Sequence, residues 1–342
     1  MLTAINLNGV RVTSFAYFCG HEQWHPEELV RHAQLAEEAG FDAVLVSEHF
    51  HPWVDDVSAS GFAYATIAAM AQATERIEFI TGVTTPLFRF HPAIVAQAAA
   101  TLSRLSNGRF QLGVGTGENI NEGPLGYHFP KYAERAARMR EALEIMRRLL
   151  DGEKLTFDGE YYKTDRAKLY SPPLSRVPLW MAAGGPKSSA LAAELADGII
   201  TSVKDPAVTF ERVIDPARSA AKDAGRPAPR FLATRWSIYA QDEDEAWEAL
   251  ASWRGLRAPG RLEAVDPQTL RERADEMPRS EILERYSIVA NADDYVETYL
   301  PLITEIGADY VTIQTSSTDQ ESLIAMLGDE VLPRLREAAS QG

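Results

Sequence analysis

The stretch FQLGVGTGENINE, residues 110–122, joins an apolar, strand-like run to three closely spaced glycines and an acid. It only superficially matches the dinucleotide fingerprint GxGxxG, because an acid and no helix-forming run follow the last glycine. No Lys-Ser or Lys-Thr pair follows either, so a P-loop is excluded. We interpret it as a strand whose glycines let a ligand lie against the backbone, with Glu118 beside that ligand. A tight turn with a solvated Glu118 is the alternative.

Outward from this strand, β-rich and helical runs alternate along the whole chain. The expected strands lack clean polar alternation, which is typical of parallel strands covered on both faces. They are Val10–Phe18, Ala43–Val46, Ile77–Thr81, Phe110–Val114, Leu179–Ala182, Gly198–Ser202, Phe231–Tyr239 and Tyr310–Gln314. Helices are expected at Pro26–Ala39, Pro92–Leu105, Tyr132–Leu150 and Asp319–Ala339. This order predicts an α/β protein with a (β/α)₈ TIM barrel, and a doubly wound open sheet is the competing fold.

The 342 residues fit one barrel domain, 1–342, that carries two insertions. The first, residues 154–173, contains Asp158-Gly159, a typical hairpin turn. The second, residues 241–291, is long, helical and charged, and precedes the last strand. We expect insertions at the C-terminal mouth of the barrel, where loops usually define the substrate.

Composition restricts the partners. The formal net charge of −15 argues against nucleic acid and anionic membranes, so any anionic ligand needs a local basic cluster. No apolar stretch approaches the ~20 residues that cross a bilayer. The start of the chain, Met1 to Val12, lacks the pattern of a signal peptide, which predicts a cytoplasmic protein. Cys19 is the single cysteine and no metal-ligand spacing occurs, so no metal site is expected.

A second candidate cluster is VSEHFHPW, residues 46–53, directly after an expected strand. The C-terminal ends of barrel strands hold the active sites, so Glu48, His49 and Trp53 are placed for catalysis. An imidazole has a reference pKa of about 6.5 and can transfer protons near neutral pH. An indole can cover a flat ring. The alternative is a structural packing cluster.

A third cluster is AAGGPKS, residues 182–188, where a strand enters a Gly184-Gly185 turn and a proline starts a helix. Backbone N–H groups and the helix dipole there favour an anion, and Lys187 and Ser188 add donors. A plain strand-to-helix turn explains the pattern equally well.

Two weaker signals remain. The end of the strand at Ile80–Pro86 could place the Gly82 and Val83 backbone against a ring, although simple strand termination is the preferred explanation. Cations from separate segments, Lys204, Arg261 and Arg285, could converge with Thr201 on a phosphate, or could be ordinary solvated residues.

Taken together, these motifs resemble the bacterial luciferase-like superfamily and, within it, the glucose-6-phosphate dehydrogenases that use coenzyme F420. The similarity runs along almost the whole chain. Its strongest segments are VSEHFHPW at 46–53, TTPLFRFHPAIVAQAAAT at 84–101, GVGTGENINE at 113–122, AAGGP at 182–186 and SIVANADDYVE at 287–297.

The resemblance implies an F420-dependent dehydrogenase acting on CH–OH groups. Hydride would pass from a sugar 6-phosphate to the 8-hydroxy-5-deazaflavin and give a phosphogluconolactone-type product. His49 and Glu118 would handle protons, Trp53 would be the active-site tryptophan, and Glu22 a further active-site carboxylate. The cofactor positions would be Glu48, Gly82, Val83, Thr85, Thr116, Gly117, Asn121, Gly184, Gly185, Lys187 and Ser188. The sugar-phosphate pocket would be Thr201, Lys204, Arg261 and Arg285. Relatives imply a homodimer.

The chain departs from that pattern at three positions. Glu48 stands where an aspartate is usual, and Arg261 replaces a lysine, which keeps the charge but not the geometry. Gly82 replaces a serine at a position where the family bends its backbone through an unusual peptide bond. Three other functions stay open: an F420-dependent secondary alcohol dehydrogenase or ketone reductase, an FMN-dependent luciferase-like monooxygenase, and a non-catalytic ligand-binding barrel. FMN is the less favoured cofactor.

Overall fold

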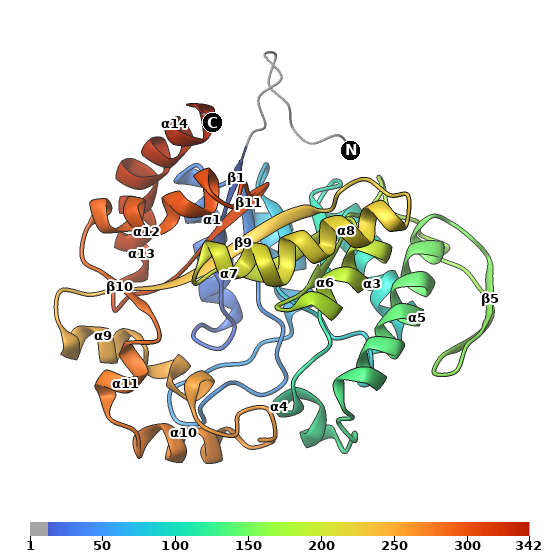
Figure 1. The fold of residues 1–342 in the computed structure, drawn as a ribbon, viewed down its shortest axis with the longest axis horizontal. Helices are drawn as coiled ribbons and strands as arrows, with labels where there is room; N and C mark the ends of the chain where they lie inside the picture. Colours follow the sequence, from blue (N-terminus) through green and yellow to red (C-terminus); the bar gives the residue numbers. More distant parts are fainter. Residues whose placement is uncertain (1–12, 342) are drawn as a thin grey trace.

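The structure is a computed structural model that describes residues 13–341. Eight parallel strands close into a barrel, because β11 pairs with β1 and β8 with β9 (Figure 1). Around the barrel they run β1 (Ser14–Cys19), β2 (Ala43–Val46), β3 (Glu78–Thr81), β4 (Phe110–Val114), β7 (Leu179–Ala182), β8 (Gly198–Ser202), β9 (Arg230–Tyr239) and β11 (Tyr310–Ser316). The barrel prediction is confirmed and the open sheet is excluded. The expected strand residues Val10–Val12 lie outside the described part.

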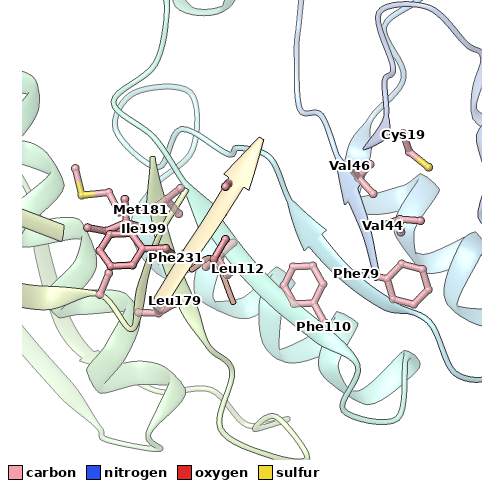
Figure 2. Packing of buried hydrophobic residues seen from close by; sticks show 14 of the residues in the cluster. Cys19, Val44, Val46, Phe79, Phe110, Leu112, Leu179, Met181, Ile199 and Phe231 are labelled. Atoms are coloured by element: carbon pink, nitrogen blue, oxygen red, sulfur yellow. The ribbon is translucent and has the colours of Figure 1, made fainter. Parts of the chain in front are cut away.

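The strands are apolar on both faces because each face packs against protein. Outward side chains such as Val44, Phe79 and Leu112 belong to one buried cluster beneath the helices (Figure 2). Inward side chains such as Leu45 and Ile80 belong to a second cluster inside the barrel. This double burial explains why the strands show no polar alternation in the sequence.

Helices cover the outside of the barrel (Figure 1). The longer ones are α1 (Pro26–Glu38), α2 (Ala63–Ala73), α3 (Pro92–Leu105), α5 (Tyr132–Leu150), α6 (Pro186–Leu195), α8 (Asp215–Asp223), α12 (Ala292–Thr304), α13 (Gln320–Met326) and α14 (Leu332–Gln341). Short α4 (Asn119–Glu122) and α7 (Pro206–Thr209) follow β4 and β8. The single last helix expected at Asp319–Ala339 is interrupted by a π-helical turn, Leu327–Val331. Gly328 in that turn lies against Ala39, where a β-carbon would come within 2.7 Å of the Ala39 carbonyl oxygen.

The first insertion forms the predicted antiparallel hairpin, β5 (Leu155–Asp158) with β6 (Lys163–Ala167). It packs on the side of the barrel, because the Glu141 carboxylate of α5 accepts backbone N–H groups from Tyr161 and Tyr162 at 3.0 Å. None of its residues lines the cavity at the mouth.

The second insertion contains α9 (Glu243–Ala249), a 3₁₀ segment (Ala251–Arg257), α10 (Pro267–Asp275), α11 (Arg279–Leu283) and β10 (Ser287–Val289), which pairs with β9. Figure 1 shows α10 at the same end of the barrel as α4, which follows the C-terminal end of β4. Arg254 ties the insertion down through Asp56 at 2.8 Å and Asp275 at 3.0 Å. Within residues 13–341, no helix is long and apolar enough to cross a membrane.

Candidate active site

A cavity of about 750 Å³ opens at the C-terminal ends of the strands. Many of the predicted site residues line it: Glu22, His49, Trp53, Gly82, Val83, Thr116, Glu118, Gly184, Gly185, Ser188, Thr201 and Arg261. The remaining predicted residues are not among its lining: Glu48, Thr85, Gly117, Asn121, Lys187, Lys204 and Arg285. Active sites of (β/α)₈ barrels lie at this end of the strands, so this cavity is the candidate active site.

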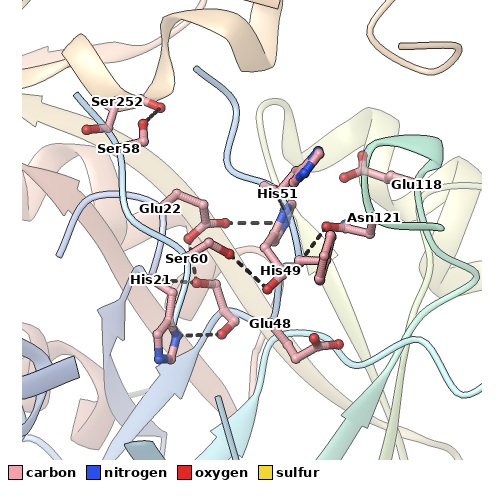
Figure 3. A network of polar contacts seen from close by, with 12 residues as sticks. His21, Glu22, Glu48, His49, His51, Ser58, Ser60, Glu118, Asn121 and Ser252 are labelled. Carbon is pink, nitrogen blue, oxygen red and sulfur yellow. Dashed lines mark hydrogen bonds and ion pairs between the residues drawn. The ribbon is translucent and has the colours of Figure 1, made fainter. Parts of the chain in front are cut away.

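The imidazole of His49 faces the buried Glu22 carboxylate (Figure 3). Its Nδ1 donates to the His51 carbonyl at 3.0 Å, because a carbonyl oxygen can only accept. Its Nε2 lies 3.3 Å from Glu22 Oε1. The Ser47 hydroxyl donates to the other oxygen of Glu22 at 2.5 Å and fixes the carboxylate. The structure thus sets an imidazole nitrogen beside a fixed carboxylate at the cavity wall, an arrangement that suits proton transfer.

Trp53 packs against the histidine ring and is only 3% exposed. The ring centroids of His49 and Trp53 lie 5.0 Å apart in an edge-to-face arrangement. Trp236 and Trp253, 4.5 Å apart, extend this aromatic wall along the cavity. The tryptophans of the later segments were not predicted as site residues.

Glu118 reaches the cavity from a different segment, the turn between β4 and α4. Its carboxylate pairs with Arg261 Nη1 at 2.5 Å, and the two side chains are 28% and 30% exposed. The guanidinium group of Arg261 also lies over the Trp53 ring, 5.7 Å from its centroid. The structure thus brings His49 and Glu118, the predicted proton-handling residues, to one cavity. Arg261 was predicted for the sugar-phosphate pocket but pairs with Glu118 instead.

Glycine is present at the positions around the cavity for different physical reasons. A β-carbon at Gly113 would lie 1.9 Å from the Thr81 carbonyl oxygen, and one at Gly115 would lie 2.5 Å from the Val83 side chain. Gly117 has a φ of +80°, in the left-handed region that favours glycine. The protein's own packing and backbone conformation therefore require these three glycines. The prediction that they let a ligand lie against the backbone is not needed to explain them. Only at Gly184 would a β-carbon meet no atom within 4 Å, although that residue lines the cavity.

The Gly82–Val83 peptide bond is cis, and both residues line the cavity. The unusual peptide bond expected at this position is therefore present, even with glycine in place of serine.

Glu48 lies behind the cavity wall. Both of its oxygens accept from Arg89 Nη2 at 2.6 Å, and Arg89 also pairs with the buried Glu122. Burial raises the pKa of the Glu122 carboxyl, and the Arg89 charge opposes that rise. Asn121 accepts the Phe50 backbone N–H at 2.9 Å. Glu48 and Asn121 thus hold the loops that carry the cavity-lining residues.

Two cavity-lining residues at the start of α5, Tyr132 and Arg135, were not predicted. Arg135 donates to the Gly117 carbonyl at 3.1 Å and stacks on Phe129 at 4.2 Å. Its buried Nε has no hydrogen-bond partner among the described residues. Ser188 and the N-terminus of α6 line the same cavity. The only sequence signal for Arg135 was its place in the first turn of an expected helix.

Three cations form a cluster beside the mouth: Lys204, Arg257 and Arg285. Burial lowers the pKa of Lys204, and the positive charges of Arg257 and Arg285 lower it further. Within the described chain, no carboxylate pairs with Lys204 or Arg257, while Arg285 pairs with Glu281 at 2.7 Å. Arg257 was not predicted as a site residue, whereas Arg261, which was, pairs with Glu118. A protein with a net charge of −15 therefore keeps an excess of positive charge here, which suits an anionic ligand.

The fold and this cavity define an enzyme of the (β/α)₈-barrel class with a histidine and two carboxylates in the cavity at its mouth. The chain belongs to the luciferase-like monooxygenase family, whose profile matches residues 13–302.

Several curated relatives are named F420-dependent glucose-6-phosphate dehydrogenase. The protein from Nakamurella multipartita is 36% identical over 336 residues, which is 96% of this chain and 98% of the relative. The one from Nocardia farcinica is 37% identical, over 93% of this chain and 96% of the relative.

Solved structures share the fold. An F420-dependent secondary alcohol dehydrogenase in complex with an F420-acetone adduct matches with a TM-score of 0.88 and 32% identity, over 95% of this chain and 99% of that one. A coenzyme F420-dependent tetrahydromethanopterin reductase from Methanopyrus kandleri matches with a TM-score of 0.77 and 24% identity, over 95% and 99%. The second likeness shows the fold alone.

Proposed function

We propose that the protein is a coenzyme F420-dependent dehydrogenase that oxidises a sugar 6-phosphate of the glucose 6-phosphate type at its anomeric carbon. The observation that carries this proposal is the cluster of Lys204, Arg257 and Arg285, which lies beside a cavity that holds His49 and Glu118. A cation cluster in which Arg285 alone pairs with a carboxylate, among the described residues, fits a phosphate group, whereas a simple alcohol would leave the remaining charge without a partner. The names of the relatives agree with this substrate class.

The cavity residues fit the cofactor. The open space at Gly184 leaves room for a ligand against the backbone, and the N-terminus of α6 with Ser188 offers donors to an anionic tail. Arg135 adds a charge whose Nε still lacks a partner within residues 13–341. We assign ring contacts to Gly82, Val83, Thr116 and Gly184. Glu48, Thr85, Gly117 and Asn121 would support these contacts from behind, and Lys187 would meet the tail at the surface.

When bound, the deazaflavin supplies a ring carbon that accepts hydride. The cation cluster and Thr201 would hold the phosphate and so bring the anomeric hydroxyl to His49 and Glu118. One of the two would take the hydroxyl proton and the other would balance charge on the reduced ring. Glu22 would exchange a proton with His49, and Trp53 would exclude water. Fixed placement of the reacting carbon supplies much of the rate.

The assay is reduction of oxidised F420, followed by the loss of its visible absorbance, with sugar phosphates and with isopropanol. We expect bleaching with a sugar 6-phosphate and none with isopropanol. Lys204→Met and Arg257→Met should each raise KM for the sugar phosphate by roughly 10–100-fold, the usual cost of one charged hydrogen bond. Arg279→Met, in an exposed pair with Asp244, is the matched control and should behave like the unchanged protein. Turnover of isopropanol without turnover of any sugar phosphate would favour the secondary alcohol dehydrogenase.

We also propose that the protein is a cytoplasmic homodimer without a nucleic-acid partner. The outer faces of α2 and α3 support the dimer: α2 has no charged residue, and Phe62, Ile94 and Leu105 are 55%, 55% and 44% exposed. A second copy would cover these exposed apolar side chains. Light scattering should give the mass of two chains, and the mass of one chain would exclude the dimer.

A further inference from the structure

The Glu22 carboxylate is buried at the cavity wall and has few partners. Its side chain is 3% exposed, and among the described residues no lysine or arginine pairs with it. His49 Nε2 lies 3.3 Å from its Oε1 (Figure 3). The Ser47 hydroxyl donates to Oε2 at 2.5 Å, a length typical of a hydrogen bond to a charged oxygen. A buried carboxylate is costly unless hydrogen bonds compensate its charge, so Glu22 depends on Ser47.

Ser47 is itself held by His21 from the neighbouring strand end. Ser47 directly follows β2, and His21 comes two residues after β1. The His21 backbone N–H donates to Ser47 Oγ at 2.8 Å, and His21 Nδ1 donates to the Ser47 carbonyl, also at 2.8 Å. The Ser47 backbone N–H donates to the Cys19 carbonyl at 3.1 Å. Because Ser47 Oγ accepts from His21, its own proton is directed to Glu22.

His21 supports this arrangement from behind the cavity. It is 0% exposed and is not among the residues that line the cavity. Burial lowers the pKa of the His21 imidazole, and the negative charge of Glu22 opposes that lowering. A neutral ring with its proton on Nδ1 accepts at Nε2, which lies 2.9 Å from the Thr66 hydroxyl of α2. Both ring nitrogens therefore have partners within the protein, which fits a support for Ser47 and not a group that meets the substrate.

We propose that Ser47 is a positioning residue for proton transfer: held by His21, it keeps the Glu22 carboxylate turned toward His49. This inference rests on the proposed function and deepens it. Ser47 exchanges no proton with the substrate in this role. It keeps Glu22 Oε1 beside Nε2 while the histidine gains and loses a proton, so the two groups need no rearrangement between turnovers. Fixed placement of such groups makes proton transfer efficient.

The first test removes the hydroxyl. Ser47→Ala should lower kcat for glucose 6-phosphate roughly 10–100-fold, the usual cost of a small misplacement of a reacting group. KM should change only a few-fold, because the cation cluster is untouched. Ser47→Thr keeps the hydroxyl and should retain most of kcat. Ser47→Cys keeps the side-chain size but donates weakly, so it should show the same loss as Ser47→Ala and serves if that variant does not fold.

The matched control is Ser103→Ala. Ser103 is 1% exposed, lies in α3, and its hydroxyl has no hydrogen-bond partner among the described residues. This variant also removes a buried serine hydroxyl, but it should leave kcat and its pH profile unchanged.

A double-mutant cycle tests whether Ser47 acts through Glu22. Ser47→Ala should change the pH profile of kcat in the same direction as Glu22→Gln. The double variant should be little slower than Glu22→Gln alone, because Ser47 then has no charged carboxylate to hold. Losses that multiply in the double variant would overturn the inference, as would near-normal kcat of Ser47→Ala or an equal loss in Ser47→Thr.

A crystal structure of Ser47→Ala, or of Ser47→Cys, gives a readout that does not depend on turnover. We expect the Glu22 carboxylate to have turned away from His49 Nε2. A carboxylate that keeps its 3.3 Å contact with His49 in this variant would overturn the inference. Failure of the proposed function has a different signature: no sugar phosphate reduces the cofactor even in the unchanged protein, whatever the position of Glu22 in the variant.

Discussion

Replacing His49 with alanine is expected to lower kcat for the sugar phosphate by roughly 10²–10⁴-fold, the usual contribution of a positioned proton-transfer group. His49 Nε2 lies 3.3 Å from the Glu22 carboxylate at the cavity wall, and no other histidine lines that cavity within the described chain. The affinity for F420 should change only a few-fold, because the assigned cofactor contacts come from other segments. Steady-state bleaching measures the first quantity, and a fluorescence titration with the cofactor measures the second.

Two further variants separate chemistry from packing. His128→Ala removes an exposed histidine outside the cavity and should leave turnover unchanged. Glu22→Gln keeps the shape beside His49 but removes the carboxylate charge next to the imidazole, so it should alter the pH profile of kcat more than the cofactor affinity. Near-normal turnover of His49→Ala across pH would show that the histidine is structural.

The second large effect concerns stability: Arg89→Met should destabilise the protein by about 3–5 kcal/mol, the usual cost of leaving a buried ion pair without one partner. Arg89 is the shared partner of Glu48 and Glu122, whose side chains are 3% and 0% exposed. Without Arg89, two carboxylates would stay buried and uncompensated. Urea unfolding followed by circular dichroism measures the change.

The pH dependence of that loss has a definite sign. Burial already raises the pKa of Glu122, and removal of the Arg89 charge raises it further. A carboxyl with a raised folded-state pKa favours folding at low pH, where it is protonated, and loses that contribution as pH rises. The variant should therefore lose more stability at pH 8 than at pH 5. Arg140→Met, which breaks an exposed pair with Glu194, should cost at most about 1 kcal/mol. An equally small loss for Arg89→Met would contradict this account of the network.

Most of the barrel could be predicted from the sequence because its parallel strands are buried on both faces and appear as continuous apolar runs. The strand Phe110–Val114 and the helix Pro92–Leu105 have the predicted bounds. The break in the last helix could not be predicted from local sequence, because Gly328 within it packs against Ala39, a residue distant in sequence. Gly113 and Gly115 were misinterpreted for the same reason: the atoms that a β-carbon would meet there belong to Thr81 and Val83, at the end of another strand.

The candidate site, too, could be predicted from the sequence only in part. His49, Trp53 and Glu118 follow strands directly, so their convergence at one mouth follows from the fold. Arg257 and Arg261 lie on an insertion, where sequence gives neither the path of the loop nor the direction of the side chains. Their partners, the cation cluster for one and Glu118 for the other, are therefore visible only in the structure.

The F420 reduction assay tests the central claim most directly when the sugar phosphate carries deuterium at its anomeric carbon. The account predicts that the unchanged protein bleaches F420 with glucose 6-phosphate and that mass spectrometry finds the deuterium in the reduced cofactor. Absence of bleaching with every sugar 6-phosphate, or bleaching without deuterium in the cofactor, would contradict hydride transfer from that carbon.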